Sequence, residues 1–384
     1  MKSLKPTVKD LGEFGLIDRL RRLLPQEPSS VLVGLGDDVA VLRSMPDRLL
    51  LATCDSQVES VHFLRQSIPP RFLGQRVAAV NLSDIAAMGG TPLWALMSVM
   101  LPESTPVDWV EDLYEGVIET LRTHGAVLVG GNTARHPDRI VLDMTLLGEV
   151  DANRVLLRRG ARVGDVIVVT GSLGASKAGL ESLRMFPFLV EEAAEAFNAW
   201  KKERSSGMDV LQAQPLSRGE NFKNPLSALD REIWLQAVFK HWVPEPRVRE
   251  GRLMAASGWV HAMIDVSDGL LGDLAHLCEA NGVGAVIDVD ALPVDSACEA
   301  VAQALGQDAI LWALSGGEDY ELLAAVDPVG LDNIVENLAQ AGAVPCRVVG
   351  RIVPRDDGIR CMRRDGSLME ITSGHAWDHF GGKP

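Results

Sequence analysis

The chain lacks an excess of positive charge and any apolar run long enough to cross a membrane. Its 384 residues include 37 lysines and arginines against 52 aspartates and glutamates, a net charge of −15. This balance argues against a nucleic-acid binder, because such proteins neutralise phosphates with a basic surface. Residues 1–6 also lack the apolar segment of a signal peptide. We therefore expect a protein that binds neither nucleic acid nor membrane.

The chain also lacks paired cysteines. Its five cysteines are scattered, and none belongs to a Cys-x-x-Cys motif: Cys54, Cys278, Cys298, Cys346 and Cys361. This pattern fits a reduced, cytoplasmic protein better than a disulfide framework or a zinc site. Cys54 is a nucleophile only in principle, because its neighbours in the sequence suggest no histidine base.

The common phosphate-binding motifs are absent as well. Residues 171–178 approach a P-loop, but Ser176 replaces the required glycine and Ala178 replaces the Ser or Thr that holds the metal. No protein-kinase catalytic loop occurs, and no Gly-x-Gly-x-x-Gly motif opens a helix. These absences disfavour the common nucleotide folds, although the turn at Gly174 is compatible with a helix N-terminus beside a ligand.

The chain does contain a series of short acidic groups beside glycine or small polar residues. Most of them interrupt or end an apolar run, where a carboxylate is costly unless it is paired or binds a cation. Ligands that are all oxygen favour Mg²⁺ over zinc. We therefore predict one metal site built from distant parts of the chain. The groups are Gly36-Asp37-Asp38, Thr53-Cys54-Asp55, Asn81-Leu82-Ser83-Asp84, Asp265-Val266-Ser267-Asp268 and Gly316-Gly317-Glu318-Asp319.

Single members of this series also have purely structural explanations. Asp84 is compatible with a helix residue in a satisfied hydrogen bond, and Asp268 with an N-cap before Gly269. His62 lies between two apolar residues, so a packed core histidine and a ligand contact are equal alternatives. One shared site explains the whole series better than several independent caps in apolar surroundings.

The apolar pattern predicts an α/β (α+β) fold in two domains, residues 1–150 and 151–384, because a chain of 384 residues exceeds the usual size of one core. Residues 188–227 have weak periodicity and predict an insertion, partly helical and partly loop. Strands are expected at 31–33, 39–42, 49–53, 93–101, 126–129, 140–150, 166–170, 261–266, 285–289, 320–326 and 346–352. Helices are expected at 12–24, 76–88, 106–123, 174–183, 232–239, 269–281 and 331–341.

The acidic groups and their neighbours resemble, in order, the signatures of the thiamine-monophosphate kinase family. The similarity covers nearly the whole chain except residues 188–227, and only the wider superfamily of ATP-dependent synthetases with this fold competes. It implies a two-domain AIR synthetase-like fold, with a mixed N-terminal sheet flanked by helices and a C-terminal α/β domain. The matching segments are 35–40, 55–63, 80–89, 130–133, 164–171, 264–270, 315–322 and 377–380.

The resemblance implies transfer of the ATP γ-phosphoryl group to thiamine monophosphate, giving thiamine diphosphate, by direct in-line transfer without a phosphoenzyme. Donor and acceptor are both polyanions, so an acidic protein needs several Mg²⁺ ions to bring them together. The resemblance also implies a homodimer formed through the N-terminal sheets, with ATP in a groove between the domains.

By matched position, the resemblance gives roles to residues of this chain. Asp55, Asp84 and Asp268 are expected at the catalytic centre, and the residues expected to contact thiamine monophosphate are His62, Glu318 and Trp377. The expected Mg²⁺ ligands are Asp38, Thr53, Cys54, Asp55, Asp84, Asn132, Asp265 and Asp268. The expected ATP contacts are Thr53, Cys54, Tyr114, Gly131, Asn132, Arg158 and Ser267.

The chain departs from the family pattern at two of these positions. Cys54 stands where relatives commonly have Ser or Thr, which weakens a side-chain role there. Asn132 stands where many relatives have Asp, and an amide oxygen donates less charge to Mg²⁺ than a carboxylate does. Trp377 could stack on the cationic thiazolium, worth about 1–2 kcal/mol when desolvated, or anchor the C-terminal tail.

Two other functions stay open from the sequence. The protein could be a superfamily relative that uses ATP to activate a different phosphate or carbonyl substrate. It could also be a nucleotide sensor that keeps the metal site without catalysis, an alternative left open by Cys54 and Asn132.

Overall fold

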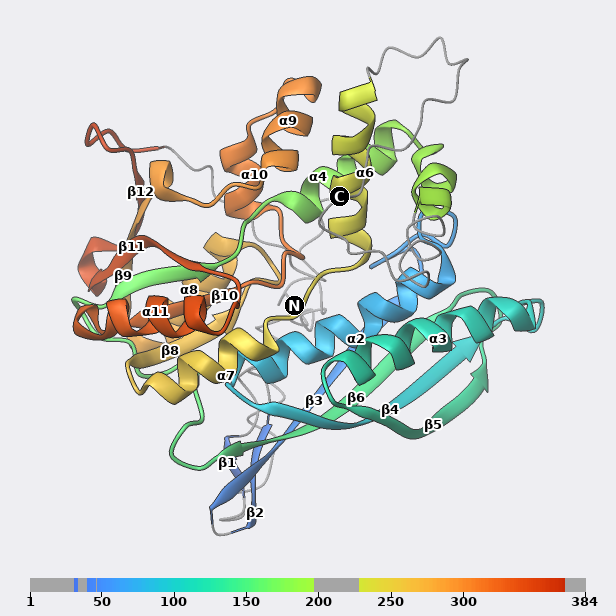
Figure 1. Ribbon diagram of the computed structural model, residues 1–384, viewed down its shortest axis with the longest axis horizontal. Helices are drawn as coiled ribbons and strands as arrows, with labels where there is room; N and C mark the ends of the chain where they lie inside the picture. Colours follow the sequence, from blue (N-terminus) through green and yellow to red (C-terminus); the bar gives the residue numbers. More distant parts are fainter. Residues whose placement is uncertain (1–30, 34–39, 46, 197–227, 370–384) are drawn as a thin grey trace, which may run out of the picture.

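The computed structural model describes residues 31–33, 40–45, 47–196 and 228–369, which form two six-stranded sheets (Figure 1). The strands of the first sheet are β1 (Val31–Val33), β2 (Ala40–Met45), β3 (Arg48–Val58), β4 (Thr91–Leu101), β5 (Val127–Arg135) and β6 (Val141–Asp151). Their order is β1-β2-β3-β6-β4-β5. Neighbours are antiparallel except β4 and β5, which are parallel, so the sheet is mixed.

Helices α2 (Pro70–Ala87) and α3 (Val107–Thr123) cover one face of this sheet (Figure 1). Side chains alternate between the two faces of a strand, and the burial follows this alternation. In β6, Leu142 and Met144 are buried beneath the helices, whereas Asp143 between them is partly exposed. One face of the sheet is therefore apolar and buried beneath the helices, and the opposite face is partly exposed.

Within the described part of the chain, no helix covers the other face of the first sheet (Figure 1). Trp94 and Leu96 of β4 are 48% and 43% exposed there. Val127 of β5 pairs directly with Trp94 and is also exposed. Large apolar side chains gathered on one open face are typical of an interaction surface.

The second sheet is built from β7 (Val166–Thr170), β8 (Val260–Asp265), β9 (Val283–Asp288), β10 (Leu322–Val326), β11 (Cys346–Pro354) and β12 (Ile359–Met362). Its order is β12-β9-β11-β7-β10-β8, antiparallel except for the β12–β9 pair. Helices of this half that lie wholly within the described residues include α4 (Ala175–Met185), α6 (Ala228–Trp242), α7 (Val248–Ser257), α8 (Leu270–Asn281), α9 (Ser296–Leu305), α10 (Ala309–Ser315) and α11 (Leu331–Gln340), with short 3₁₀ turns η2 (Val289–Ala291), η3 (Pro328–Gly330) and η4 (Arg355–Asp357).

Helix α2 lies between the two halves and is buried on almost all sides, because it packs against β3, α3, α7 and β8. Its contact with α3 is close: a Cβ on Gly74 would lie 2.0 Å from the carbonyl oxygen of Leu113, so glycine lets the two backbones touch. The buried set also includes the polar residues Arg76, Asn81 and Ser83. Buried polar groups need partners inside the protein, so α2 is where the two halves exchange polar contacts.

The α/β class is confirmed, and most predicted elements occur with shifted ends. The helix expected at 76–88 begins at Pro70, because proline fits the first turn of a helix. The strand expected at 126–129 continues to Arg135 through its pairing with β4. Helices α7, α9 and α10 and strand β12 were not expected, because such short segments show too little periodicity.

Two further expectations fall partly or wholly outside the described residues. The helix expected at 12–24 lies outside them, as does 197–227 of the expected insertion, whereas 189–196 is helical. Among the described helices, none combines the length and apolar character needed to span a bilayer.

Candidate active site

Helix α2 makes side-chain hydrogen bonds to β3 on one side and to β8 on the other, and each bond involves an expected metal-binding carboxylate. Thr53 Oγ1 of β3 donates a hydrogen bond to Asp84 Oδ2 at 2.5 Å. Ser83 Oγ donates to Asp265 Oδ2, at the end of β8, at 2.7 Å. Asp84 is thus a helix residue with a satisfied hydrogen bond, as its structural alternative predicted. Asp84 and Ser83 are neighbours on α2, so this helix binds β3 through one residue and the end of β8 through the next.

Asp55 is held to the same helix through its backbone, since its N–H donates to Asn81 Oδ1 at 3.2 Å. Successive side chains of a strand point to opposite faces, so Asp55 and Thr53 face α2 while Cys54 faces the open side of the sheet. There Cys54 Sγ donates to Asp143 Oδ1 at 3.3 Å. The structure therefore brings Thr53 and Asp55 together and places the Cys54 thiol away from both.

Asp268 lies in the loop that follows β8, directly before α8. The N-cap position of α8 is Gly269, so the alternative role of Asp268 as an N-cap is wrong. The backbone N–H groups of Ser267 and Asp268 instead donate to Asp273 Oδ2, each at 3.1 Å. Asp273 thus fixes the backbone of two expected site residues.

The loop before β10 lies against this loop and carries Glu318. The N–H of Glu318 donates to the carbonyl of Ser267 at 2.7 Å, and the N–H of Tyr320 donates to that of Val266 at 2.9 Å. Both Glu318 and Tyr320 have positive φ angles, 59° and 52°. Such angles are uncommon for residues with a side chain and persist where surrounding contacts hold them. The two hydrogen bonds supply such contacts.

Tyr320 places this loop beside the carboxylates. Burial raises the pKa of Tyr320 well above its ordinary value; the charges of Glu318, Asp55 and Asp265 also raise it, against the opposing effect of Arg76. Charges from β3, β8 and the loop before β10 thus all act on this one buried tyrosine.

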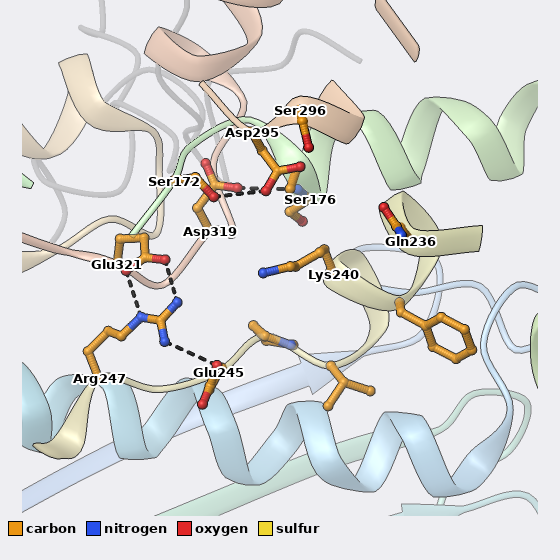
Figure 2. A pocket seen from close by; sticks show the side chains of 14 residues that line it. Ser172, Ser176, Gln236, Lys240, Glu245, Arg247, Asp295, Ser296, Asp319 and Glu321 are labelled. Carbon is orange, nitrogen blue, oxygen red and sulfur yellow. Dashed lines mark hydrogen bonds and ion pairs between the residues drawn. The ribbon is translucent and has the colours of Figure 1, made fainter. Parts of the chain in front are cut away.

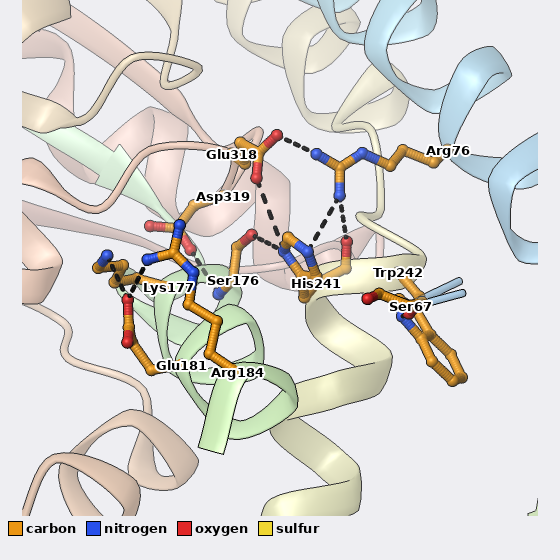
Figure 3. A network of polar contacts seen from close by, with 10 residues as sticks. All are labelled: Ser67, Arg76, Ser176, Lys177, Glu181, Arg184, His241, Trp242, Glu318 and Asp319. Atoms are coloured by element: carbon orange, nitrogen blue, oxygen red, sulfur yellow. Dashed lines mark hydrogen bonds and ion pairs between the residues drawn. The ribbon is translucent and has the colours of Figure 1, made fainter. Parts of the chain in front are cut away.

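A buried network connects Glu318 to both halves of the chain (Figure 3). Arg76 Nη2 donates to Glu318 Oε1, and Arg76 Nη1 donates to the carbonyl oxygen of His241 at 3.1 Å. Ser176 Oγ lies 3.0 Å from His241 Nδ1. Burial, followed by the charge of Arg76, lowers the pKa of His241 to about 3, so this imidazole is neutral at physiological pH.

The charge of His62 acts on Glu318, which relates two of the residues expected to contact thiamine monophosphate. Burial raises the pKa of Glu318, but the charges of Arg76, His241 and His62 and the Arg76 hydrogen bond together outweigh burial, so the pKa of Glu318 is lowered. His62 is partly exposed, and its Nδ1 accepts a hydrogen bond from the N–H of Val58 at 3.0 Å. His62 is therefore not a fully packed core residue, and the proton of its neutral form lies on Nε2.

The expected nucleotide residues Gly131 and Asn132 lie elsewhere in the same sheet. They belong to β5, and the order β3-β6-β4-β5 puts them three strands from β3, or about 14 Å at the usual strand spacing. Ser98 of β4 pairs with both Asn132 and Asp143, so Asn132 shares the open face of the sheet. Within one chain, the structure thus separates Asn132 from Asp55.

The remaining expected residues are also dispersed. Tyr114 is half-buried on α3 and packs against the core of the first half. Arg158 lies in the connection from β6 to β7, where its carbonyl oxygen accepts a hydrogen bond from Asn281 Nδ2 at 2.8 Å. Asp38 and Trp377 lie outside the described residues.

A cavity of about 380 Å³ lies behind the Glu318 loop (Figure 2). Residues 319 and 321 line it, and no expected metal, ATP or thiamine monophosphate residue does. Lys240 points into it from α6 (Figure 2). Its polar lining is Ser172, Ser176, Gln236, Lys240, Glu245, Arg247, Asp295, Ser296, Asp319 and Glu321.

Replacing Asp319 by asparagine should stabilise the protein at pH 8 and have a smaller effect at pH 5. Asp319 accepts hydrogen bonds from the N–H groups of Gly174 and Ser176, and burial raises its pKa to about 7. A folded-state pKa above the unfolded value means that the folded protein holds this proton more tightly. The stability that this proton contributes to the wild type is full below the unfolded pKa of Asp319 and is lost as pH rises towards 7. Urea unfolding at the two pH values measures the difference.

The exposed helix cap Asp308 provides a control for this prediction, since it also accepts backbone hydrogen bonds, from Ile310 and Leu311. The Asp308→Asn variant should show no gain at pH 8. An equal effect of Asp319→Asn at both pH values would contradict the proposed titration.

Three buried polar residues of this region are not predicted by the sequence pattern: Arg76, His241 and Arg247. The sequence does contain a signal for Arg76: it lies in the apolar, Ala- and Val-rich part of α2, and an arginine there needs a buried partner. His241 and Arg247 follow the 188–227 segment, where the pattern gave no indication of a site.

Comparison with known proteins identifies the fold as that of the AIR synthase related proteins. The family model for the N-terminal domain of AIR synthase related protein matches residues 36–150, and that for the C-terminal domain matches residues 242–361. The fold predicted from the sequence is thereby confirmed.

Closer relatives narrow this class to one family. Thiamine-monophosphate kinase of Salmonella typhimurium is 34% identical over 372 residues, covering 96% of this chain and 98% of that protein, and that of Haemophilus influenzae is 31% identical with the same coverage. A solved structure described as AaThiL complexed with AMPPCP and TMP is 30% identical, with a TM-score of 0.75 over 98% of this chain and 100% of the other. The chain belongs to the thiamine-monophosphate kinase family.

Proposed function

We propose that this chain transfers the γ-phosphoryl group of ATP to thiamine monophosphate and releases thiamine diphosphate and ADP. The observation that carries the proposal is that α2 holds the backbone of Asp55 through Asn81 and the side chain of Asp265 through Ser83, while the N–H of Glu318 binds the carbonyl of Ser267, two residues after Asp265. The segments expected to bind Mg²⁺ and the segment expected to bind thiamine monophosphate therefore contact one another. Membership in a kinase family over 96% of the chain supports the same activity.

Mg²⁺ fits the residues at this place by their chemistry. Asp55, Asp84 and Asp265 present oxygen donors of the kind that Mg²⁺ prefers. No group of three or more His, Cys, Asp and Glu side chains in the described ranges is arranged to hold a metal by itself. Mg²⁺ usually binds through one or two carboxylates together with water and substrate phosphates, so a complete protein cage is not required. When bound, Mg²⁺ neutralises the charge of the phosphates.

We assign the chain's own residues to three tasks. Asp55, Asp84, Asp265 and Asp268 hold Mg²⁺ and with it the phosphates of both substrates. Glu318, kept anionic by Arg76, faces the cationic part of thiamine monophosphate beside His62. Transfer then rests on positioning and charge neutralisation, as is general for phosphoryl transfer. The other proposed contacts are Asp38, Thr53, the backbone of Cys54, Tyr114, Gly131, Asn132, Arg158, Ser267 and Trp377.

The activity is tested by incubating the purified protein with Mg-ATP and thiamine monophosphate and separating the products by chromatography. Formation of thiamine diphosphate and ADP in equal amounts is the expected result. ATP turnover without thiamine diphosphate would instead favour a superfamily relative with another substrate. ATP binding in calorimetry without any turnover would favour the nucleotide sensor.

We further propose a cytoplasmic homodimer formed through the open face of the first sheet, with the domain boundary at residues 150 and 151. Trp94, Leu96 and Val127 offer an apolar surface on this face, and Asn132 lies on it as well. A second copy packed there would cover these side chains and enclose Asn132, whose distance from Asp55 within one chain is otherwise unexplained.

Replacing Trp94 by glutamate should convert the dimer to monomers, because a buried charge opposes association at an apolar interface. Sedimentation velocity measures the state of the variant. Val329 is 79% exposed in the second half of the chain, and Val329→Glu provides the control that should remain dimeric. A wild-type protein that sediments as a monomer would overturn the dimer.

A further inference from the structure

Arg76 is a buried cation at the contact between the two halves of the chain. Its side chain is 1% exposed, although it lies on α2 among valine, alanine and leucine residues. An arginine so buried is strongly unfavourable unless a negative charge and hydrogen-bond acceptors surround it. Its Nη2 meets Glu318 and its Nη1 meets the carbonyl of His241, whereas its Nε is buried without a hydrogen bond. The hydrogen bonds of the guanidinium group are therefore made by its two terminal nitrogens, to Glu318 and to His241.

The contacts leave part of Glu318 available. Arg76 binds Oε1, while Oε2 lies 3.6 Å from His241 Nδ1, which is beyond hydrogen-bonding distance. The Glu318 side chain is 31% exposed, in contrast to that of Arg76. His241 is kept in place by Ser176 and by the bond from Arg76 to its carbonyl. Arg76 therefore holds one oxygen of Glu318, while the other accepts no hydrogen bond from His241 and the side chain keeps part of its surface exposed.

The position of Arg76 on α2 relates this carboxylate to the metal-binding group. Arg76 and Asp84 lie eight residues apart on one continuous helix, which corresponds to about 12 Å along its axis. The same helix carries Ser83, which binds Asp265. Glu318 and the carboxylates that hold phosphate are thus set relative to each other by one rigid element.

We propose that Arg76 is a positioning residue for the acceptor: it fixes the Glu318 carboxylate, from behind, at a set distance from the phosphate end of the site. This inference rests on the proposed function, in which Glu318 binds the cationic part of thiamine monophosphate. Arg76 itself acts through Glu318 and takes no part in binding ATP.

A double-mutant cycle on Arg76 and Glu318 tests this role. The Arg76→Met variant should raise KM for thiamine monophosphate about 10- to 100-fold, the range for loss of a hydrogen bond to a charged group. KM for ATP should stay within about twofold, since the affected group binds the acceptor. Arg76→Lys keeps the charge but loses the planar fork, so it should recover part of the effect.

The decisive measurement is the effect of Arg76→Met in a Glu318→Gln background. If Arg76 works through Glu318, the second substitution should add little to KM for thiamine monophosphate. Additive effects, or an equal rise in KM for ATP, would overturn the proposal. Urea unfolding of all variants checks that folded protein is compared. Absence of thiamine diphosphate formation by the wild type would refute the proposed function itself, a result distinct from additivity in an active enzyme.

Discussion

Replacing Asp55 by asparagine should lower kcat for thiamine diphosphate formation by about 10²- to 10³-fold, the cost of removing one preorganised charge contact in a transition state. The free energy of unfolding should change little. The bond that ties Asp55 to Asn81 uses the backbone N–H, which the substitution retains, and the side chain is partly exposed. Initial rates of product formation, measured by chromatography, give kcat.

Asp332 is exposed in the first turn of α11, and Asp332→Asn serves as the control with the same change of charge. It should keep wild-type kcat. Raising the Mg²⁺ concentration should restore part of the affinity lost by Asp55→Asn but little of the rate, because a neutral amide oxygen attracts the ion less. Undiminished turnover by Asp55→Asn would remove Asp55 from the catalytic centre.

Replacing Glu321 by glutamine should destabilise the protein by about 3–5 kcal/mol, the usual cost of breaking a buried ion pair, since the remaining partner of Arg247, Glu245, is 70% exposed. Arg247 Nε and Nη2 donate to Glu321 Oε2 and Oε1 at 2.7 and 2.6 Å, and the two side chains are only 6% and 4% exposed. Thr170 Oγ1 also donates to Glu321, at 2.7 Å. Urea unfolding, with an unchanged m-value, measures the loss.

Two controls identify the cause. The double substitution Arg247→Met with Glu321→Leu removes both charges and should recover most of the stability, because well-packed apolar residues can replace a buried ion pair. The Arg360–Asp357 pair is 45% and 44% exposed, so Asp357→Asn should cost at most about 1 kcal/mol. A Glu321→Gln variant as stable as the wild type would show that the pair contributes little.

The pair also bears on function through the loop before β10. In this loop Asp319 and Glu321 line the cavity, whereas Glu318, which binds Arg76, does not. Anchoring of Glu321 by Arg247 therefore helps to hold Glu318 in its unusual backbone conformation. If this connection holds, the Glu321→Gln variant should show a raised KM for thiamine monophosphate, and its activity should fall by the same factor.

Much of the fold and part of the site were readable from local pattern. Strands such as 166–170 and helices such as 331–341 have clear periodicity, and the acidic groups beside small residues indicated the family. Period-two alternation, applied to β3, was also sufficient to place Cys54 and Asp55 on opposite faces. A metal role for Cys54 therefore falls to its backbone, in keeping with the weakened side-chain role expected at this position.

The partners of Arg76 could not be read from the sequence, because a buried charge finds its counterion through folding and not through sequence spacing. Glu318 is 242 positions away from it, and His241 is 165. Likewise, only the stacking of α2 between two sheets decides that Ser83 meets Asp265. Local patterning specifies which residues carry charge and which segments are helices or strands. The packing of those segments specifies which charges meet, since burial makes the free energy of each charge depend on its neighbours.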